Sequence, residues 1–271
     1  MLGRARNRAI VFAVAAMIVG ACTIPVCAQT PFSFTTYEKL LRPLNYLRGR
    51  ASPYVDRKTD FFGGIDAAKA VTFVWAGATW SPKGTLVEDG WRIRFMGAGG
   101  LYTYETSAVP GGINDVNAYS AELLGGYRKT FQDIFGTTIY AAAFVGLFHE
   151  TQLLSYADRS NPAQGGETGI KGSAELYARV WQHYILTAFA NASNVHNKYY
   201  VKGTVLRELN ESWGIGAEFA TMGDARYSEN RVGVAGTFTW QRKIFALSLG
   251  ALDNSGRGSG FYTTFSIYSP L

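Results

Sequence analysis

The sequence contains few cysteines, no apolar run long enough to span a membrane and only a small excess of positive charge. It has two cysteines, Cys22 and Cys27, and both lie near the N-terminus. A mature chain that begins at Gln29 has none. It can therefore form no disulfide framework, no thiolate nucleophile and no cysteine metal site.

The first residues have the composition of an export signal. Three arginines precede Ala9–Gly20, an apolar run of about a dozen residues that is too short to span a bilayer. Cleavage after Ala28 fits a small-x-small signal-peptidase site, and a cut before Cys22 resembles lipoprotein processing. We predict residues 1–28 as the signal peptide, because a lipid anchor is redundant on a protein that inserts by itself.

Residues 29–60 differ from the rest of the chain. They are polar and basic and contain Pro31, Pro43 and Pro53. We predict a periplasmic N-terminal extension, which serves either as a disordered tether or as a contact arm for a partner.

No later stretch approaches 18 consecutive apolar residues, so no transmembrane helix is predicted. The most apolar stretch is Tyr140–Phe148. Removing the three arginines of the leader leaves 23 basic residues against 20 acidic ones, and the net charge falls from +6 to +3. This small excess is weak evidence for a nucleic-acid partner, and we expect none.

Signatures of catalysis are also missing. There is no Gly-x-Ser-x-Gly elbow and no phosphate-binding loop. The three histidines, His149, His183 and His196, share no metal-ligand spacing. We predict no enzyme, no cofactor and no metal. A hydrolase built on His149 and Glu150 is the third and least supported alternative.

What the sequence does contain is alternation, which is clearest in its last forty residues. In Arg231–Gln241, Ile244–Asp253 and Phe261–Tyr268, large apolar residues occupy one parity and small or polar residues the other. A period of two predicts strands. The small and polar parity suits the inside of a barrel whose outside faces lipid.

The same pattern extends back to Phe61 and predicts an all-β fold, an antiparallel up-and-down transmembrane β-barrel of about twelve strands over residues 61–271. The predicted strands are Phe61–Ala67, Val71–Trp80, Trp91–Glu105, Ala118–Lys129, Thr137–His149, Ile170–Trp181, Tyr184–Asn191, Lys198–Leu209, Trp213–Met222, Arg231–Gln241, Ile244–Asp253 and Phe261–Tyr268. Short and long connections alternate, as in outer-membrane barrels, with both chain ends periplasmic. Two connections do not follow this alternation: Ala68–Ala70 is short and Ser81–Gly90 is long.

Charged residues lie on the parity that faces away from lipid. They are Arg92, Arg94, Glu122, Arg128, Lys171, Glu175, Arg179 and Glu218. So many charges cannot fill the dry core of a secreted sandwich or lipocalin-like barrel. They predict either a salt-bridge network that stiffens a narrow lumen or a polar track for a hydrophilic solute.

We favour a constricted barrel in which opposite charges pair across neighbouring strands. The constriction is expected near Glu122, Arg128, Glu175 and Arg179, with Glu175 and Arg179 as possible partners. A glycosidase pair of Glu122 and Glu175 is not favoured, because the nearby arginines would keep both carboxylates ionised.

Aromatic residues gather at the predicted strand ends. They are Tyr102, Tyr104, Tyr119, Tyr199, Tyr200, Trp91, Trp213, Tyr227 and Tyr268. They predict an interfacial girdle, and the alternative is a sugar-stacking platform on the long loops.

Several short Gly-rich fragments resemble a known family. They are Phe62–Asp66, Asp89-Gly90, Gly125–Tyr127, Asp158–Pro162, Gly169 and Lys171, Trp213–Glu218, Gly223, Tyr227, Arg231–Gly233, Asp253 and Gly256–Gly260. In their order and spacing over residues 60–271, the chain resembles the alphaproteobacterial cellulose biosynthesis protein BcsS family. One departure is the end Tyr268–Leu271, which lacks the terminal aromatic common in outer-membrane barrels.

The resemblance implies a non-enzymatic outer-membrane accessory to cellulose biosynthesis or export, acting as a constricted channel or a scaffold. It implies outer-membrane lipid as a partner, with cellulose, glucan or components of the cellulose synthase complex as further candidates. We expect a monomer. The alternative from another class is a general small-solute porin.

Overall fold

The computed structural model describes residues 57–134, 137–181, 183–224 and 227–270. The predicted signal peptide, both candidate cleavage sites and most of the predicted extension 29–60 lie outside the described residues. The described chain forms twelve strands. They are β1 Thr59–Ala68, β2 Val71–Trp80, β3 Gly90–Glu105, β4 Ile113–Ile134, β5 Thr137–Leu154, β6 Gly165–Val180, β7 Tyr184–Ser193, β8 Lys198–Glu208, β9 Trp213–Gly223, β10 Ser228–Trp240, β11 Lys243–Asn254 and β12 Gly258–Pro270. Two 3-10 turns, η2 (Pro110–Gly112) and η3 (Val195–Asn197), lie in connections.

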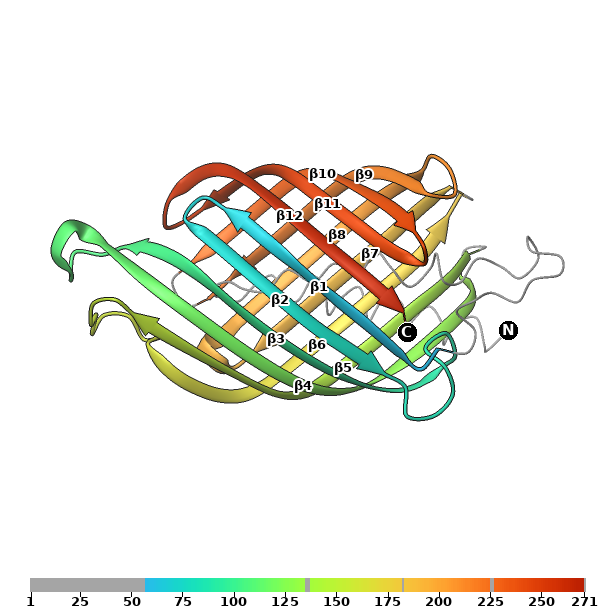
Figure 1. Ribbon diagram of the computed structural model, residues 1–271, viewed down its shortest axis with the longest axis horizontal. Helices are drawn as coiled ribbons and strands as arrows, with labels where there is room; N and C mark the ends of the chain where they lie inside the picture. The colour runs from blue at the N-terminus through green and yellow to red at the C-terminus, as the bar shows by residue number, and fades with distance from the viewer. Residues whose placement is uncertain (1–56, 135–136, 182, 225–226, 271) are drawn as a thin grey trace.

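The strands form one closed antiparallel barrel in which each strand pairs with its neighbours in sequence. β1 pairs with β12 from Asp60 opposite Pro270 to Ala68 opposite Tyr262, which closes the ring (Figure 1). The predicted fold class and the predicted number of strands are confirmed. None of the described helices is long and apolar enough to cross a membrane.

The outward face of the barrel is apolar and the inward face is polar, as the alternation predicts. On β10, Val232 is 63% exposed whereas the neighbouring Arg231 is 4% exposed. On β12, Phe261 is exposed and Thr264 is buried. The outward apolar set also includes Ile65, Val74, Phe95, Leu123, Val145, Leu147, Ile170, Val205, Ile215, Phe219, Leu247 and Leu249. A continuous apolar exterior is the arrangement of a barrel solvated by lipid.

The two ends of the barrel differ. We call the end where β1 begins and β12 finishes the terminal end, and the opposite one the loop end. At the loop end β3, β4, β5 and β6 project beyond the other strands (Figure 1). β4 begins at Ile113 and β5 extends to Leu154, each five residues beyond the predicted boundary. Polar residues interrupt the alternation there, so the sequence pattern underestimates these strands.

Exposed tryptophans mark the terminal end. Five of the six tryptophans are 45–82% exposed and sit at or next to the strand termini of this end: Trp80, Trp91, Trp181, Trp213 and Trp240. Trp91 packs edge-on against Tyr127, with ring centroids 5.5 Å apart. Amphipathic indoles favour the membrane–water interface, so this belt indicates where the apolar exterior ends.

Candidate functional site

The predicted lumen residues do point into the barrel. Arg92, Arg94, Glu122, Arg128, Lys171, Glu175 and Glu218 are all buried, and Arg179 is partly exposed. Each lies on the inward parity of its strand. The structure therefore brings the predicted charges into one lumen and adds residues that we did not predict, above all Lys198, Lys202, Glu150 and Glu208.

Opposite charges pair inside this lumen, but mostly not between neighbouring strands as expected. Lys171 on β6 reaches Glu122 on β4, with 2.5 Å between Nζ and Oε2. Arg94 on β3 pairs with Glu175 on β6, three strands away, and Lys198 on β8 pairs with Glu150 on β5. Side chains on the inside of a curved barrel wall point toward one another. These pairs therefore cross the lumen between strands that are not neighbours. Lys202 and Glu218, 2.6 Å apart, do join adjacent strands.

The expected pairing of Glu175 with Arg179 is wrong. Glu175 pairs with Arg94, and these side chains are 2% and 3% exposed. Arg179 instead forms two hydrogen bonds with Glu208 on β8, at 2.6 and 3.1 Å. Arg94 also lies over the ring of Phe144, 4.0 Å from its centroid. Spacing along one strand could not reveal these partners, because both come from other strands.

A layer of apolar side chains crosses the lumen. We call it the central layer; it consists of Trp75, Met96, Phe189, Tyr200, Ala220 and Met222. Trp75 comes from β2 and Tyr200 from β8, which lie six strands apart in a ring of twelve. These are opposite walls, so the packed layer spans the barrel. Phe189 and Tyr200 have ring centroids 5.8 Å apart.

Gly64 makes room for this layer. A Cβ atom on Gly64 would lie 2.4 Å from Cζ2 of Trp75, so the indole lies directly against the backbone of β1. Any larger residue would displace Trp75. Gly64 belongs to the fragment Phe62–Asp66, for which the sequence alone suggested no role.

The connection between β2 and β3, residues 81–89, is held against the barrel at the terminal end. Arg92 donates to the carbonyls of Thr85 and Leu86, at 3.0 and 3.2 Å, and to the Ser81 hydroxyl at 2.9 Å. Arg128 donates to the carbonyl of Glu88 at 3.1 Å. Two predicted lumen arginines thus anchor this long connection.

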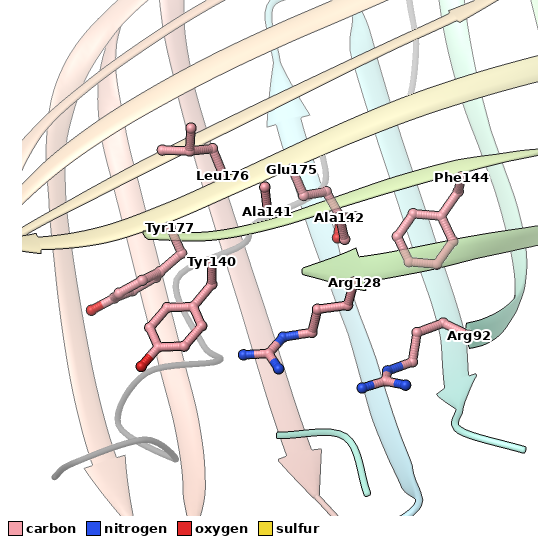
Figure 2. Close-up of a pocket in the computed structure, with 9 residues that line it drawn as sticks. All are labelled: Arg92, Arg128, Tyr140, Ala141, Ala142, Phe144, Glu175, Leu176 and Tyr177. Atoms are coloured by element: carbon pink, nitrogen blue, oxygen red, sulfur yellow. The ribbon is translucent and has the colours of Figure 1, made fainter. Parts of the chain in front are cut away.

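A small cavity lies beside these arginines (Figure 2). Its volume is about 20 Å³, and its lining includes Arg128, Tyr140, Glu175 and Tyr177. The Arg128 guanidinium is 4.9 Å from the centroid of the Tyr140 ring, which lies next to Tyr177 (Figure 2). This space fits a single water molecule. It is too small for a solute.

A much larger cavity of about 430 Å³ opens at the loop end. We call it the loop-end cavity. Its lining comes from nearly every connection of that end: Lys69, Val71, Tyr102, Thr103, Tyr104, Glu105, Thr106, Gln152, Ser160, Asn161, Pro162, Lys198, Asp224, Tyr227, Asn254, Ser255, Gly256 and Arg257. Its size falls within the range of about 300–1,000 Å³ typical of small-ligand sites.

The aromatic set that we predicted as one girdle divides into three groups. Trp91, Trp213 and Tyr119 point outward, as an interfacial girdle requires. Tyr199 is half-buried and also lies on the outward parity of its strand. Tyr200 and Tyr268 are buried on the inward face. Tyr102, Tyr104 and Tyr227 line the loop-end cavity, as the sugar-platform alternative proposed.

Asp158 ties two loops together beside this cavity. Its Oδ2 accepts hydrogen bonds from Tyr104 at 3.0 Å and Thr106 at 2.9 Å, and its Oδ1 accepts from Ser160. The Ser160 hydroxyl, followed by these other donors, lowers the pKa of Asp158 to about 2. The fragment Asp158–Pro162 therefore holds the β5–β6 connection over the cavity in a fixed shape.

The described residues contain no catalytic arrangement that we recognise. His149 is exposed on the outer face, whereas Glu150 is buried in the lumen beside Lys198, so the two cannot cooperate. Glu122 forms an ion pair with Lys171, and Glu175 forms one with Arg94. Within the described ranges, no group of three or more His, Cys, Asp or Glu residues is placed to hold a metal ion.

Comparison with known proteins identifies the family. Residues 61–271 match the family model described as "Cellulose biosynthesis protein BcsS". The chain belongs to this family. The resemblance noted in the sequence is thus confirmed over the whole barrel. No curated protein sequence matches the chain closely enough to count as a relative.

Solved structures match the chain at low sequence identity. The KdgM porin in complex with disordered oligogalacturonate matches with a TM-score of 0.47 and 9% identity, covering 78% of this chain and 99% of that one. OprB of Pseudomonas putida matches with a TM-score of 0.33 and 9% identity, covering 80% and 92%. The CymD monoaromatic hydrocarbon channel matches at 0.33 and 8%, covering 90% and 95%.

Fragments that carried the family resemblance meet in space. Asp66 from the first fragment pairs with Arg231 from a later one. Asp158–Pro162, Tyr227 and Gly256-Arg257 all contribute to the loop-end cavity. The sequence contained each fragment but gave no signal that these would converge, because their strands are brought together only by closure of the ring.

Proposed function

We propose that this chain is an outer-membrane barrel that serves bacterial cellulose production as a non-enzymatic accessory, with its terminal end in the periplasm. Its family supports the link to cellulose. The apolar exterior and the tryptophan belt support insertion in a membrane. Lipid is thus its first partner. A single chain completes the ring, which supports a monomer.

The central layer is the observation that favours a scaffold over an open channel. Trp75 and Tyr200 belong to one packed cluster that joins opposite walls of the lumen. The charge pairs add further side chains to the interior, and these are almost completely buried. A glucan chain or a hydrophilic solute would have to displace this layer to pass. We therefore favour a closed scaffold over a general porin.

Planar-bilayer recording tests this conclusion. The purified barrel is expected to insert and to conduct little current, without the large, steady, unselective steps of a porin. A large open conductance from the wild-type protein would overturn the closed scaffold and favour the small-solute porin.

Deletion of the gene tests the role in cellulose production. Colonies of the deletion strain are expected to bind less cellulose dye, and the gene supplied in trans should restore binding. Unchanged dye binding in the deletion strain would count against the accessory role, whatever the conductance.

A further inference from the structure

The loop-end cavity has the construction of a ligand site, and neither the family nor its membrane insertion explains it. Six connections or strand ends, separated by up to 188 positions in sequence, converge on it. Its lining combines half-buried aromatic rings with amide and hydroxyl groups. That combination of an apolar ring with nearby polar groups is what recognition of a pyranose requires.

The tyrosine rings are fixed by hydrogen bonds from their hydroxyl groups to the protein. The hydroxyl of Tyr102 donates to Oε1 of Gln152 at 2.6 Å, and that of Tyr104 donates to Asp158 at 3.0 Å. The Tyr227 hydroxyl donates to Glu229. Rings fixed in this way lose little freedom when a sugar stacks on them, so the binding surface is organised before the ligand arrives.

The cations of the lining already have partners within the protein. Lys198 pairs with Glu150, and Arg257 lies 3.6 Å from Glu105 and donates to the Thr103 hydroxyl at 2.7 Å. The Lys69 ammonium donates to the carbonyls of Arg257 and Ser259, at 2.7 and 3.3 Å. A phosphate or a uronate would have to compete for cations that already have partners. The lining therefore favours a neutral ligand.

We propose that the loop-end cavity binds a segment of neutral polysaccharide, with sugar faces on Tyr102, Tyr104 and Tyr227. Its identification as β-glucan rests on the proposed role in cellulose production. In the proposed orientation the cavity faces the cell exterior, so the barrel would hold a secreted glucan at the cell surface.

Calorimetric titration of the purified full-length protein in detergent tests the site. Cello-oligosaccharide, oligogalacturonate of equal length and malto-oligosaccharide serve as probes. The cello-oligosaccharide is expected to bind at least about tenfold more tightly than the acidic oligomer. Loss of one stacking ring in Tyr102→Leu should weaken binding by about tenfold, whereas Tyr102→Phe keeps the ring and most of the affinity.

Tyr156→Leu is the matched control, since Tyr156 is an exposed tyrosine of the same end that does not line the cavity. It should bind like the wild type. Pro162→Trp alters an exposed lining residue and should block the cavity even if Tyr102→Leu fails to fold.

Three results would overturn the proposal: no binding of cello-oligosaccharide to the wild type, tighter binding of the acidic oligomer, or unchanged binding by Pro162→Trp. If binding fails while the deletion strain still loses cellulose, the proposed function stands and only this site is refuted. If binding holds and the deletion strain is normal, the site stands without the cellulose role.

Discussion

Arg231 on β10 and Asp66 on β1 form a bidentate ion pair, with nitrogen–oxygen distances of 2.7 and 2.9 Å. The two residues are 165 positions apart in sequence and three strands apart around the ring. Thr264 on β12 adds a hydrogen bond of 2.5 Å to Asp66, and Glu229 holds the Arg231 Nε. This network spans the seam where the barrel closes.

Asp66→Asn is expected to destabilise the barrel by about 3 kcal/mol, because it removes one partner of a buried ion pair. The loss should lie at the lower end of the range for such pairs, since Glu229 still neutralises Arg231. Chemical unfolding in detergent measures it. Asp115→Asn changes an exposed aspartate and should shift stability by less than about 0.5 kcal/mol. Equal effects would show that the seam network is not stabilising.

A double-mutant cycle tests the pairing of Glu175 with Arg94. Glu175→Gln should cost about 3–5 kcal/mol, because it removes the carboxylate of a buried ion pair. Adding Arg94→Met should recover much of the loss. Adding Arg179→Met should recover none, since Arg179 pairs with Glu208. Rescue by Arg179→Met in place of Arg94→Met would contradict the pairing seen in the structure.

Trp75→Ala should raise the conductance of single barrels in a planar bilayer, because it removes the largest side chain of the central layer. It should also lower stability by about 3–5 kcal/mol, as truncation of a buried aromatic residue does. Trp80→Ala removes an outward-facing tryptophan of the same strand and should leave conductance unchanged. Conductance that stays low in both variants would mean that another layer closes the lumen.

The β5–β6 connection should remain ordered in mild acid and loosen in strong acid. Because the folded-state pKa of Asp158 is lowered to about 2, its contribution is complete above the unfolded pKa of about 3.9 and is lost as the pH falls through about 2. Hydrogen–deuterium exchange of residues 155–164, expressed as protection factors, measures this loss of order. Asp158→Asn should lose protection already at neutral pH. Protection that fades near pH 6 would point to another group.

The proposed orientation predicts which end reacts from outside the cell. In intact cells, Asn161→Cys at the loop end should react with a membrane-impermeant maleimide, whereas Arg242→Cys at the terminal end should not. Both positions lie in connections, so folding should be preserved. Both sites should react after cell lysis. The reverse pattern in intact cells would place the termini outside.

The sequence by itself determined the strands and their faces. Lipid outside and polar groups inside impose alternation on every residue that crosses the membrane, so the parity of Val232 against Arg231 could be read without coordinates. The same pattern predicted that Arg94, Glu122, Lys171 and Glu175 point inward. It ended too early on β4 and β5, because polar outward residues such as Asp115 and Thr151 interrupt the alternation there.

Only the tertiary structure decided which inward residues meet. Local spacing suggested Glu175 with Arg179, but Arg94 reaches Glu175 over three strands and Asp66 reaches Arg231 across the closing seam. The central layer and the loop-end cavity have the same origin, since Trp75 and Tyr200 can belong to one cluster only when opposite walls of the closed ring face each other. Such contacts depend on the diameter and stagger of the closed ring, which are properties of all twelve strands together.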